Sequence, residues 1–570
     1  MESSSRRSFL GAAIGAGAGP LLTVPGPAQA VETVGSWPSA LPELPERVFV
    51  DLDGRELREA ERQAARFSLG SSSVTVTPGH GSASVRVHCP SGPLGRVVLR
   101  WPLAFPEDAL FLGDHWERGY GDLQWKHLQP ERVMPWYFAA HHERSGRTFL
   151  AGVKTQPAAL CFWTVDARGI ALWLDFRNGG SPSLPGDREI AAAEIVARAS
   201  AGETPFAALS AFCRTLCPSP RLAGQPICGN NNWYYSYGRG FDAAAIRRDA
   251  AFLAEISDGH ANRPYCVIDA GWTPGSVCPG GPWTAGDAQR FPDMPGLAAE
   301  VKRLGVRPGI WMRPTALTVV DDPRRLRPGP SHDPEKPLDL TREENLALVR
   351  EDVARVFSWG YELVKHDFST YDVFARWGFE MGSEMTDAGW HFADRSRTSA
   401  EIVLRLYRTM REAAGNNVLL GCNTIGHLGA GLFEIQRTGD DTSGRTWERT
   451  RRMGVNTVAF RLPQHGAFFA SDPDCAAHTA RTPWALDRRF LELVAKSGTA
   501  LFVSADPRTT SAEEKAAFRD AMHVALSGGV PGGAEPLDWL HSTAPRRWRL
   551  GREETTYEWE EPYGALPARV

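Results

Sequence analysis

The stretch after Gln225 alternates between short apolar segments and helical segments, and this alternation constrains the fold more than any other feature. Eight strand-like segments stand at 228–234, 265–270, 307–312, 363–367, 418–422, 432–437, 468–472 and 500–504. Helix starts are expected between them, at the N-cap Asp242 and at capping boxes over 341–344 and 511–514. Eight strands that alternate with helices predict a (β/α)8 TIM barrel over residues 228–528.

Residues 31–204 follow a different, β-rich pattern. Strand-like runs at 73–77, 84–88, 97–100 and 171–175 are separated by turns rich in Gly, Pro and Ser. This spacing predicts an antiparallel β-sandwich before the barrel. A helix from Pro205 to Cys217 and a Pro-rich joint make 205–227 a linker. Residues 529–570 form a short C-terminal extension with room for a few strands or a helix.

The N-terminus has the pattern of a twin-arginine export signal. Arg6 and Arg7 precede an apolar Gly/Ala-rich run, and Ala28-Gln29-Ala30 ends it. We expect residues 1–30 to be a signal peptide, with the mature chain starting near Val31. No later stretch is long and apolar enough to span a bilayer, so a secreted or periplasmic product is expected.

The composition indicates no special class of binding partner. The formal net charge of −4 gives no argument for nucleic acid or membrane binding. The nine cysteines are an odd number and include Cys213 and Cys217, which lack the matching His/Cys pair of a zinc site. We read most of them as buried thiols and leave their pairing open. Nineteen tryptophans suit either a sugar-binding cleft or a core.

One pentapeptide, at 363–367, carries the first chemical signal. Side chains alternate along a strand, so Lys365 and Asp367 are expected on the same side. In a barrel that side is the catalytic mouth, at the C-terminal end of the strand. A positioned, ionised Asp suits the nucleophile of a covalent sugar hydrolase, whereas a strand-end ion pair is the structural alternative.

Further acidic residues follow other predicted strands. They are Asp269, Asp440, Asp441, Asp472 and Asp474. Two carboxylates on opposite sides of a cleft are the minimum for glycoside hydrolysis, about 5–5.5 Å apart in retaining enzymes and about 6.5–9.5 Å in inverting ones. A metal-dependent hydrolase using Asp269, Asp472 and Asp474 is an alternative, but the pattern of histidine ligands it needs is missing.

An ordered set of motifs resembles the α-galactosidase clan, glycoside hydrolase families 27 and 36, and family 36 more closely because of the N-terminal sandwich. The matching segments are GNNNW at 229–233, VIDAGW at 267–272, FPDM at 291–294, GIW at 309–311, KHD at 365–367, CN at 422–423, GDDT at 439–442, SDPD at 471–474 and FVSADPR at 502–508.

The resemblance implies roles for individual residues. Asp367 is implied as the nucleophile and Asp440 as the acid/base. Asp441 competes for the second role, because counting four residues on from Arg437, as some relatives do, reaches it. The implied sugar-binding set is Asp269, Lys365, Arg437 and Asp472, with Trp233, Trp272 and Trp311 as walls of the pocket. Asp472 and Asp474 could equally form only a turn.

The chain also departs from the family pattern. Ala270 stands where a second Asp is usual, Arg313 stands where family 36 has Glu, and a C-terminal sandwich is absent or vestigial. Arg313 is expected to favour an acidic or heavily hydroxylated substrate group. In relatives a sandwich loop reaches over the active site. Sequence alone predicts only an ordinary aromatic loop at 115–125.

These observations predict a secreted retaining glycoside hydrolase of α-galactosidase type that acts on an oligosaccharide or glycoside and needs no metal or organic cofactor. Related specificities stay open: α-N-acetylgalactosaminidase, β-L-arabinopyranosidase or α-glucan hydrolase. A non-catalytic carbohydrate-binding barrel is the alternative from another class. Self-association into a homo-oligomer is left open.

Overall fold

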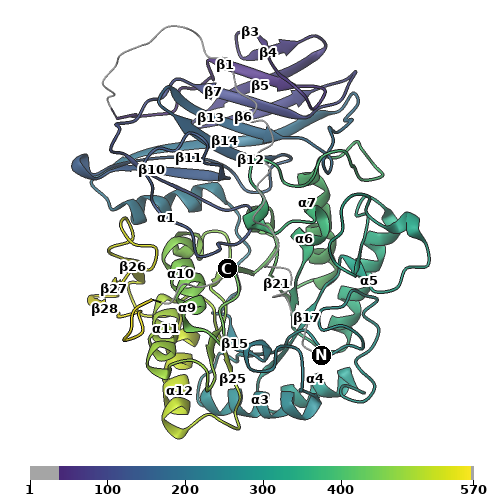
Figure 1. Ribbon diagram of the computed structural model, residues 1–570, viewed down its shortest axis with the longest axis vertical. Coiled ribbons are helices and arrows are strands. Elements are labelled where there is room, and N and C mark those ends of the chain that lie inside the picture. The colour runs from purple at the N-terminus through teal and green to yellow at the C-terminus, as the bar shows by residue number, and fades with distance from the viewer. Residues whose placement is uncertain (1–36, 566–570) are drawn as a thin grey trace.

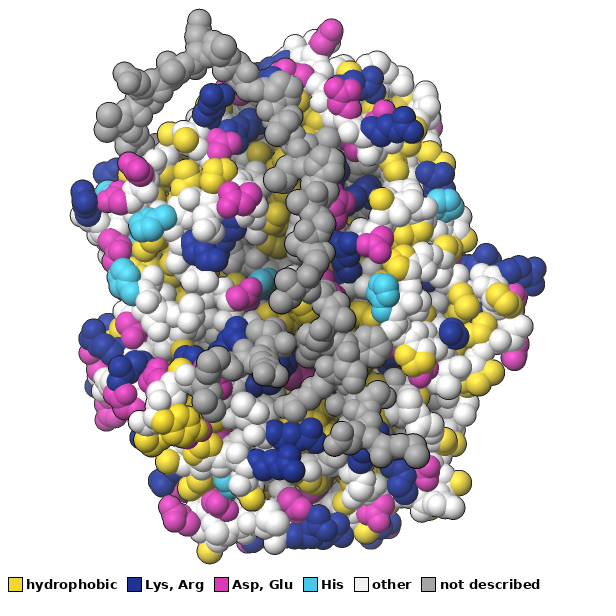
Figure 2. All heavy atoms as spheres, in the orientation of Figure 1, with side chains coloured by type: hydrophobic (Ala, Val, Ile, Leu, Met, Phe, Trp, Pro, Cys, Tyr) yellow, Lys and Arg dark blue, Asp and Glu magenta, His cyan; other side chains and the backbone are white. Residues whose placement is uncertain are grey.

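The computed structural model describes residues 37–565 and shows a β-sandwich lying across one end of an α/β barrel (Figure 1). The predicted export signal at residues 1–30 lies outside the described residues. Between residues 37 and 565, no helix combines the length and the apolar character needed to cross a membrane. On the face in Figure 2, acidic and basic side chains are interspersed over both parts.

The N-terminal part consists of two antiparallel sheets whose facing sides are buried. The smaller sheet has the strand order β2-β1-β7-β13-β12-β9, and the larger has the order β3-β4-β5-β6-β14-β11-β10-β8. The four predicted runs lie within β5, β6, β7 and β13. The strands are β1 (Arg47–Asp51), β2 (Leu57–Glu59), β3 (Glu61–Gln63), β4 (Arg66–Leu69), β5 (Ser72–Gly79), β6 (Ser82–His88), β7 (Arg96–Trp101), β8 (Leu110–Gly113), β9 (Met134–Pro135), β10 (Tyr137–His142), β11 (Arg147–Val153), β12 (Leu160–Asp166), β13 (Gly169–Asp175) and β14 (Glu189–Ala201).

The second part is a curled parallel sheet with the order β23-β22-β21-β20-β17-β16-β15-β25-β24. The two edges of this curled sheet meet where the backbone N–H of Ala500, just before β25, donates to the carbonyl oxygen of Ser471 in β23 over 2.9 Å. The predicted barrel is confirmed, but its seventh position is divided between two strands. Pro473 lacks a backbone donor and Asp474 has φ 77°, which interrupts the pairing there. The strands are β15 (Cys228–Asn231), β16 (Tyr265–Ile268), β17 (Arg307–Met312), β20 (Leu363–His366), β21 (Val418–Gly421), β22 (Ile435–Arg437), β23 (Ala470–Asp472), β24 (Ala476–His478) and β25 (Leu501–Ala505).

Helices surround the sheet, as Figure 1 shows. The two predicted caps at Asp242 and Ser511 are confirmed, since each side chain accepts a backbone N–H of the first turn. The predicted capping box at 341–344 is wrong, because the Thr341 hydroxyl donates to Asp339 and Arg342 is the N-cap of the helix. The helices are α2 (Trp233–Ser236), α3 (Ala243–Ile256), α4 (Met294–Arg303), α5 (Glu343–Ser358), α6 (Ser369–Phe374), α7 (Ser399–Ala414), α8 (Gly426–Gly429), α9 (Trp447–Thr450), α10 (Asn456–Arg461), α11 (Trp484–Ser497) and α12 (Ala512–Leu526).

Two smaller elements complete the chain. Helix α1 (Pro205–Leu216) follows the sandwich and is capped by Thr204. After α12, three short antiparallel strands form a separate small sheet: β26 (Ala534–Pro536), β27 (Arg547–Leu550) and β28 (Glu553–Thr556). This three-stranded extension lies beside α11 (Figure 1) and is far smaller than a sandwich domain.

The sandwich and the barrel share one continuous hydrophobic core. A loop between β8 and β9 extends this contact to the barrel strands. Gly119 N donates to Thr438 O, and Asp440 N donates to Gly119 O over 2.8 Å, which makes a parallel bridge with the end of β22. Gly121, at φ 73°, approaches Arg452 so closely that a Cβ would lie 2.7 Å from its carbonyl oxygen. The loop is therefore fixed onto the barrel mouth.

Candidate active site

The predicted site residues gather at one end of the barrel. Asp269 directly follows β16, Asp367 follows β20, Arg437 ends β22 and Asp472 ends β23. All four are at most 3% exposed. The strands are parallel, so their C-terminal ends form one mouth, where active sites of such barrels lie.

A buried ion pair joins two of the strand ends. Lys365 Nζ donates to Asp269 Oδ2 over 2.6 Å, and Asn231 Nδ2 donates to the same oxygen over 2.8 Å. Burial alone lowers the pKa of Lys365, but the Asp269 carboxylate outweighs this and the pKa is raised. The lysine is therefore a fixed cation in the mouth.

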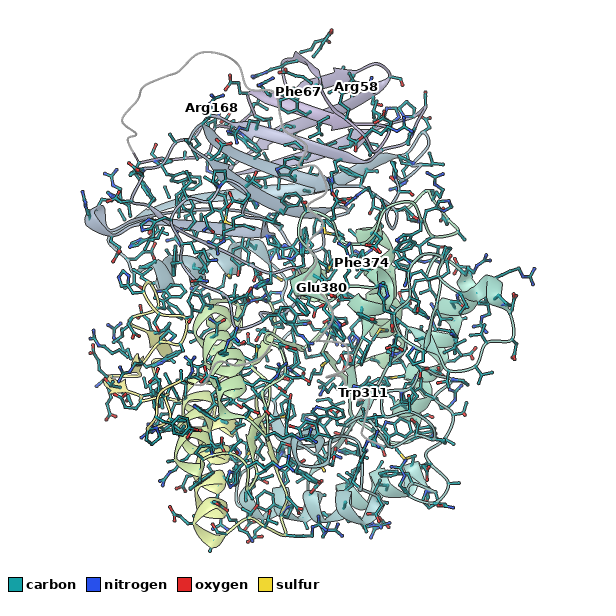
Figure 3. All side chains as sticks on the ribbon, in the orientation of Figure 1. Arg58, Phe67, Arg168, Trp311, Phe374 and Glu380 are labelled. Carbon is teal, nitrogen blue, oxygen red and sulfur yellow. The ribbon has the colours of Figure 1, made fainter. Side chains whose placement is uncertain are left out.

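The carboxylate of Asp367 is held by donors from two directions. Trp311 Nε1 donates to Oδ2 over 3.0 Å, and the backbone N–H of Phe368 donates to Oδ1 over 2.9 Å. Figure 3 shows Trp311 within the barrel, whereas Phe374 and Glu380, which follow Asp367 in sequence, lie nearer the sandwich. N–H donors on both oxygens favour the ionised carboxylate.

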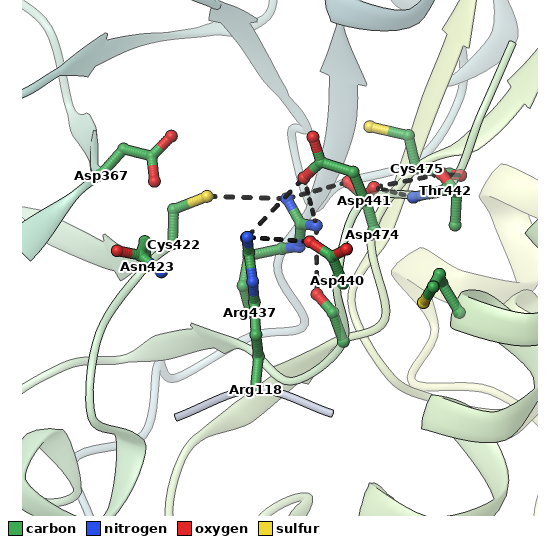
Figure 4. A network of polar contacts seen from close by, with 12 residues as sticks. Arg118, Asp367, Cys422, Asn423, Arg437, Asp440, Asp441, Thr442, Asp474 and Cys475 are labelled. Atoms are coloured by element: carbon green, nitrogen blue, oxygen red, sulfur yellow. Dashed lines mark hydrogen bonds and ion pairs between the residues drawn. The ribbon is translucent and has the colours of Figure 1, made fainter. Parts of the chain in front are cut away.

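Asp440 and Asp441 have different surroundings, shown in Figure 4. Asp440 is clamped: Arg118 Nη2 lies 2.8 Å from Oδ1, and Arg449 Nη2 lies 2.7 Å from Oδ2. Asp441 has longer contacts, with Arg437 Nη2 at 3.1 Å and Arg118 Nη1 at 3.7 Å from Oδ1. Its side chain is also the more exposed, 16% against 10%.

Arg437 is neutralised by a second carboxylate. Its Nη1 lies 3.1 Å from Asp474 Oδ1, while the Tyr234 hydroxyl and Thr442 N–H donate to Asp474 Oδ2. Asp474 is thus part of the buried network rather than a simple turn former. Asp472 accepts the N–H of Asp474, and burial together with the Asp474 charge raises the pKa of Asp472 to about 7.

The three predicted wall tryptophans are buried to different degrees. Trp233 is 5% exposed, whereas Trp272 and Trp311 are fully buried. Trp272 donates its indole N–H to Trp311 O over 2.9 Å, and Trp311 in turn holds Asp367. The two tryptophans are thus linked by a hydrogen bond to the Trp311 backbone, and both rings pack on Trp283.

Arg313 is paired with carboxylates inside the protein. Its guanidinium is 1% exposed, lies 2.6 Å from Asp372 and 3.3 Å from Asp333, and stacks on Phe368. The expectation that it attracts an acidic substrate group is not supported, since internal carboxylates already neutralise it. Ala270 is fully buried, beside Asp269.

The loop between β8 and β9 brings two residues to the mouth that the sequence did not single out. Glu117 and Arg118 are 2% and 4% exposed, and Arg118 contacts Asp440 and Asp441. Arg449 was also missed. No local pattern marks Glu117 and Arg118, because Asn423 and Asp440, which they contact, are more than 300 positions away, and Arg449 lies nine positions after Asp440 without a recognisable motif. The aromatic loop is thus a lining of the site.

Residues 37–565 show how the cysteines and the side chains that could bind a metal are arranged. In that range no group of three or more His, Cys, Asp or Glu side chains is arranged to hold a metal ion. Eight of the nine cysteines are buried thiols and Cys278 is half-buried, and burial raises the pKa of Cys213 and other thiols. The reading of most cysteines as buried thiols is confirmed.

The barrel mouth is thus lined by carboxylates and a lysine and lies under a loop of the β-sandwich. Comparison of the sequence with protein-family models and with curated proteins found no match. Solved structures do match, and the chain has the fold of family 36 α-galactosidases.

Three of these structures are representative. The α-galactosidase TtGalA from Thermus thermophilus, in complex with p-nitrophenyl α-D-galactopyranoside, is 20% identical with a TM-score of 0.57, over 86% of this chain and 98% of that one. Its complex with stachyose gives 20% identity and 0.54, over 80% and 98%. The α-galactosidase AgaA from Geobacillus stearothermophilus gives 15% and 0.56, over 84% and 72%.

Proposed function

We propose that this protein is a retaining glycoside hydrolase of α-galactosidase type, exported by the twin-arginine route. The observation that carries the proposal is the gathering of Asp367, the Asp269–Lys365 pair and the Asp440–Asp441 pair at one barrel mouth. The fold shared with α-galactosidases bound to α-galactosides supports the same assignment.

Asp367 is the proposed nucleophile. Its carboxylate is anchored by Trp311 and the Phe368 N–H, so it is oriented before substrate binds. In the first step an Asp367 oxygen bonds to the anomeric carbon while the glycosidic bond breaks. The product is a glycosyl-enzyme ester, and the leaving oxygen needs a proton from a second carboxyl group.

Asp441, rather than Asp440, is the proposed acid/base. A general acid has to take up and release a proton, and the short ion pairs on the two Asp440 oxygens, at 2.8 and 2.7 Å, oppose protonation more than the contacts of Asp441 Oδ1, at 3.1 and 3.7 Å, do. Asp440 is better suited to fix Arg118 and Arg449 in place. Asp441 protonates the leaving oxygen, then takes a proton from the water that attacks the ester. The anomeric carbon keeps its configuration after these two inversions.

Asp269 and Lys365 are the proposed sugar-binding pair. They offer a carboxylate and an ammonium on one wall of the mouth, groups that accept from and donate to hydroxyls. Trp233 is proposed as an apolar wall, with Arg437 and Asp472 supporting the opposite side. The proposed substrate is a pyranoside or an oligosaccharide that carries one.

Proton NMR during hydrolysis tests this function. The purified mature chain is incubated with a panel of nitrophenyl glycosides, and the anomer formed first is recorded before mutarotation. Release of the same anomer as the substrate supports the double displacement. First release of the opposite anomer contradicts it, and no turnover of any glycoside supports the carbohydrate-binding alternative.

A further inference from the structure

Glu117 reaches the barrel mouth from the sandwich and is held there through one of its carboxyl oxygens and its backbone. Its Oε1 accepts the Tyr120 hydroxyl over 2.6 Å and Asn423 Nδ2 over 2.5 Å. Its backbone oxygen accepts Arg461 Nη2 over 3.1 Å. Gly378 packs so closely that a Cβ there would lie 2.9 Å from Glu117 Cγ. The side chain is therefore rigidly placed.

These contacts put Glu117 beside the proposed nucleophile. Asn423 follows β21, the neighbour of β20, and its Oδ1 accepts the N–H of Tyr371, four residues after Asp367. Gly378 belongs to the segment that continues from Asp367. Glu117 is close enough to Asp367 and Asp440 for both carboxylates to act on it electrostatically.

The second carboxyl oxygen of Glu117 has no protein partner. Among residues 37–565, Oε2 is fully buried and forms no hydrogen bond. Arg118 Nη1, on the next residue, also lacks a hydrogen-bond partner, and its contact with Asp441 Oδ1 is 3.7 Å long. Buried polar atoms in folded proteins are almost always paired, so an open oxygen and an open N–H group on adjacent residues indicate a missing polar ligand.

Burial decides the protonation state of this carboxyl group. It raises the pKa of Glu117 to about 7, and the charges of Asp440 and Asp367 act in the same direction, whereas Arg118 and the Tyr120 hydrogen bond oppose them. Below neutral pH the group is mostly a neutral acid, which can donate a proton to a hydrogen bond. Ionised, it can only accept.

We propose that Glu117 and Arg118 form a second sugar-binding wall, supplied by the N-terminal sandwich. Glu117 Oε2–H donates to one hydroxyl oxygen of the bound pyranoside, and Arg118 Nη1 donates to an adjacent one. The ligand class is a neutral sugar with two neighbouring hydroxyl groups. The inference deepens the proposed function and rests on it. No bond forms or breaks at Glu117, which makes it a specificity residue.

Two substitutions test whether Glu117 acts as a neutral hydrogen-bond donor. Glu117→Gln keeps the shape and offers Nε2–H₂ as a donor, whereas Glu117→Ala removes the group. Losing a buried hydrogen bond to substrate costs about 1–3 kcal/mol, which is roughly a 5- to 150-fold loss in affinity. Glu107→Gln is the matched control, because Glu107 is an exposed glutamate of the same sandwich.

The pH dependence gives an independent readout. The titratable and charged groups that face Glu117 are Arg118, Tyr120, Asp367, Tyr407, Asp440 and Arg461. As pH rises through about 7, wild-type Glu117 ionises beside Asp367 and Asp440 and stops donating. Wild-type affinity should fall over this range, and the affinity of Glu117→Gln should stay flat.

The experiment is titration calorimetry of the full mature chain with the monosaccharide released from its best nitrophenyl substrate, or with galactose if none is hydrolysed. Measurements run from about pH 5 to about pH 9, alongside kcat and KM and the thermal midpoint of each variant. We expect Glu117→Ala to bind the sugar roughly 5- to 150-fold more weakly than wild type. The Kd of Glu117→Gln at low pH should stay within about 3-fold of the wild-type value, and Glu107→Gln should leave Kd unchanged.

Other results would contradict the proposed binding role of Glu117, the proposed function, or both. Unchanged Kd in a folded Glu117→Ala protein overturns the proposal, as does equal damage in both Glu117 variants. Restoration of Glu117→Ala turnover by azide would make Glu117 a proton-transfer group and also overturn the binding role. Sugar binding that depends on Glu117 without hydrolysis of any glycoside would preserve this inference and remove the proposed function. Absence of any sugar binding overturns both.

Discussion

The indole nitrogen of Trp311 donates to Oδ2 of Asp367 over 3.0 Å, so the end of β17 orients the carboxylate that follows β20. Trp311 is itself held from behind by Trp272, whose N–H donates to the Trp311 carbonyl. A fully buried tryptophan thus acts on the proposed nucleophile without exposing its ring to substrate. The position of Asp367 is therefore supported by residues on or just after three neighbouring strands, β16, β17 and β20.

Trp311→Phe should lower kcat about 10-fold or more while changing KM little. The substitution keeps an aromatic ring but leaves one oxygen of a buried carboxylate without its donor, which typically costs about 1–3 kcal/mol. Trp283→Phe is the matched control, since Trp283 packs on Trp311 but donates to the backbone oxygen of Arg313. Equal effects of the two substitutions on kcat would show that packing, not the hydrogen bond, matters.

Azide should restore turnover of Asp441→Ala and not of Asp440→Ala. Loss of the acid/base stalls the glycosyl-enzyme, which a small anionic nucleophile can intercept without base assistance. Loss of Asp440 instead removes the shortest ion pairs of Arg118 and Arg449 and disturbs the loop contact. The measurement is the rate and anomeric form of glycosyl azide produced. Rescue of Asp440→Ala alone would return the acid/base role to Asp440.

His427 should make the protein less stable as pH falls below about 6.5. Burial lowers the pKa of His427 to about 4: Nε2–H donates to Val153 O, and the proton taken up in acid would go to Nδ1, which is buried and has no hydrogen-bond partner among residues 37–565. A group with a depressed folded-state pKa contributes stability that is present above its unfolded pKa and lost as pH falls toward the folded pKa. The expected loss is about 3 kcal/mol between about pH 6.5 and pH 4.

Thermal midpoints of wild type and His427→Gln over this range check the effect. The variant cannot titrate, so its midpoint should fall less steeply with acid. Parallel curves would mean that His427 does not contribute, and the other buried histidines, His366 and His465, would then carry the pH dependence.

Simple α-galactosides should be poor substrates. The family resemblance implies a second aspartate that helps hold the axial hydroxyl of galactose, and here Ala270 stands in its place. A site that lacks one buried polar partner loses about 1–3 kcal/mol for the hydroxyl concerned. We compare kcat/KM for α-galactosyl, α-N-acetylgalactosaminyl and β-L-arabinopyranosyl nitrophenyl substrates. An α-galactoside value above about 10⁴ M⁻¹s⁻¹ that exceeds the other two would contradict the inference from Ala270.

The fold could be predicted largely from local patterns. Strand–helix alternation and the caps at Asp242 and Ser511 depend on neighbours in the chain, so the sequence shows them directly. Thr341 looked equivalent to Ser511, but a tertiary partner, Asp339, takes its hydroxyl. The division of the seventh barrel position arises at Pro473 and Asp474, where strand pairing is interrupted.

The site could be predicted only in part. Asp269, Lys365 and Asp367 stand at strand ends, where barrel geometry brings them together without further information. Glu117 and Arg118 lie in an irregular loop, and their partners Asn423 and Asp440 are more than 300 positions away. The burial of Arg313 likewise depends on Asp372, whose tertiary position no local pattern reveals.

The most direct test of the central claim is to trap the covalent intermediate on Asp367. The mature chain is treated with a 2-deoxy-2-fluoro glycosyl fluoride of the preferred sugar, digested, and analysed by mass spectrometry. The account predicts one sugar adduct on the peptide that contains Asp367, and neither adduct nor turnover for a folded Asp367→Asn protein, because the substitution removes the nucleophile itself. An adduct on another residue, or hydrolysis by Asp367→Asn near the wild-type rate, would contradict it.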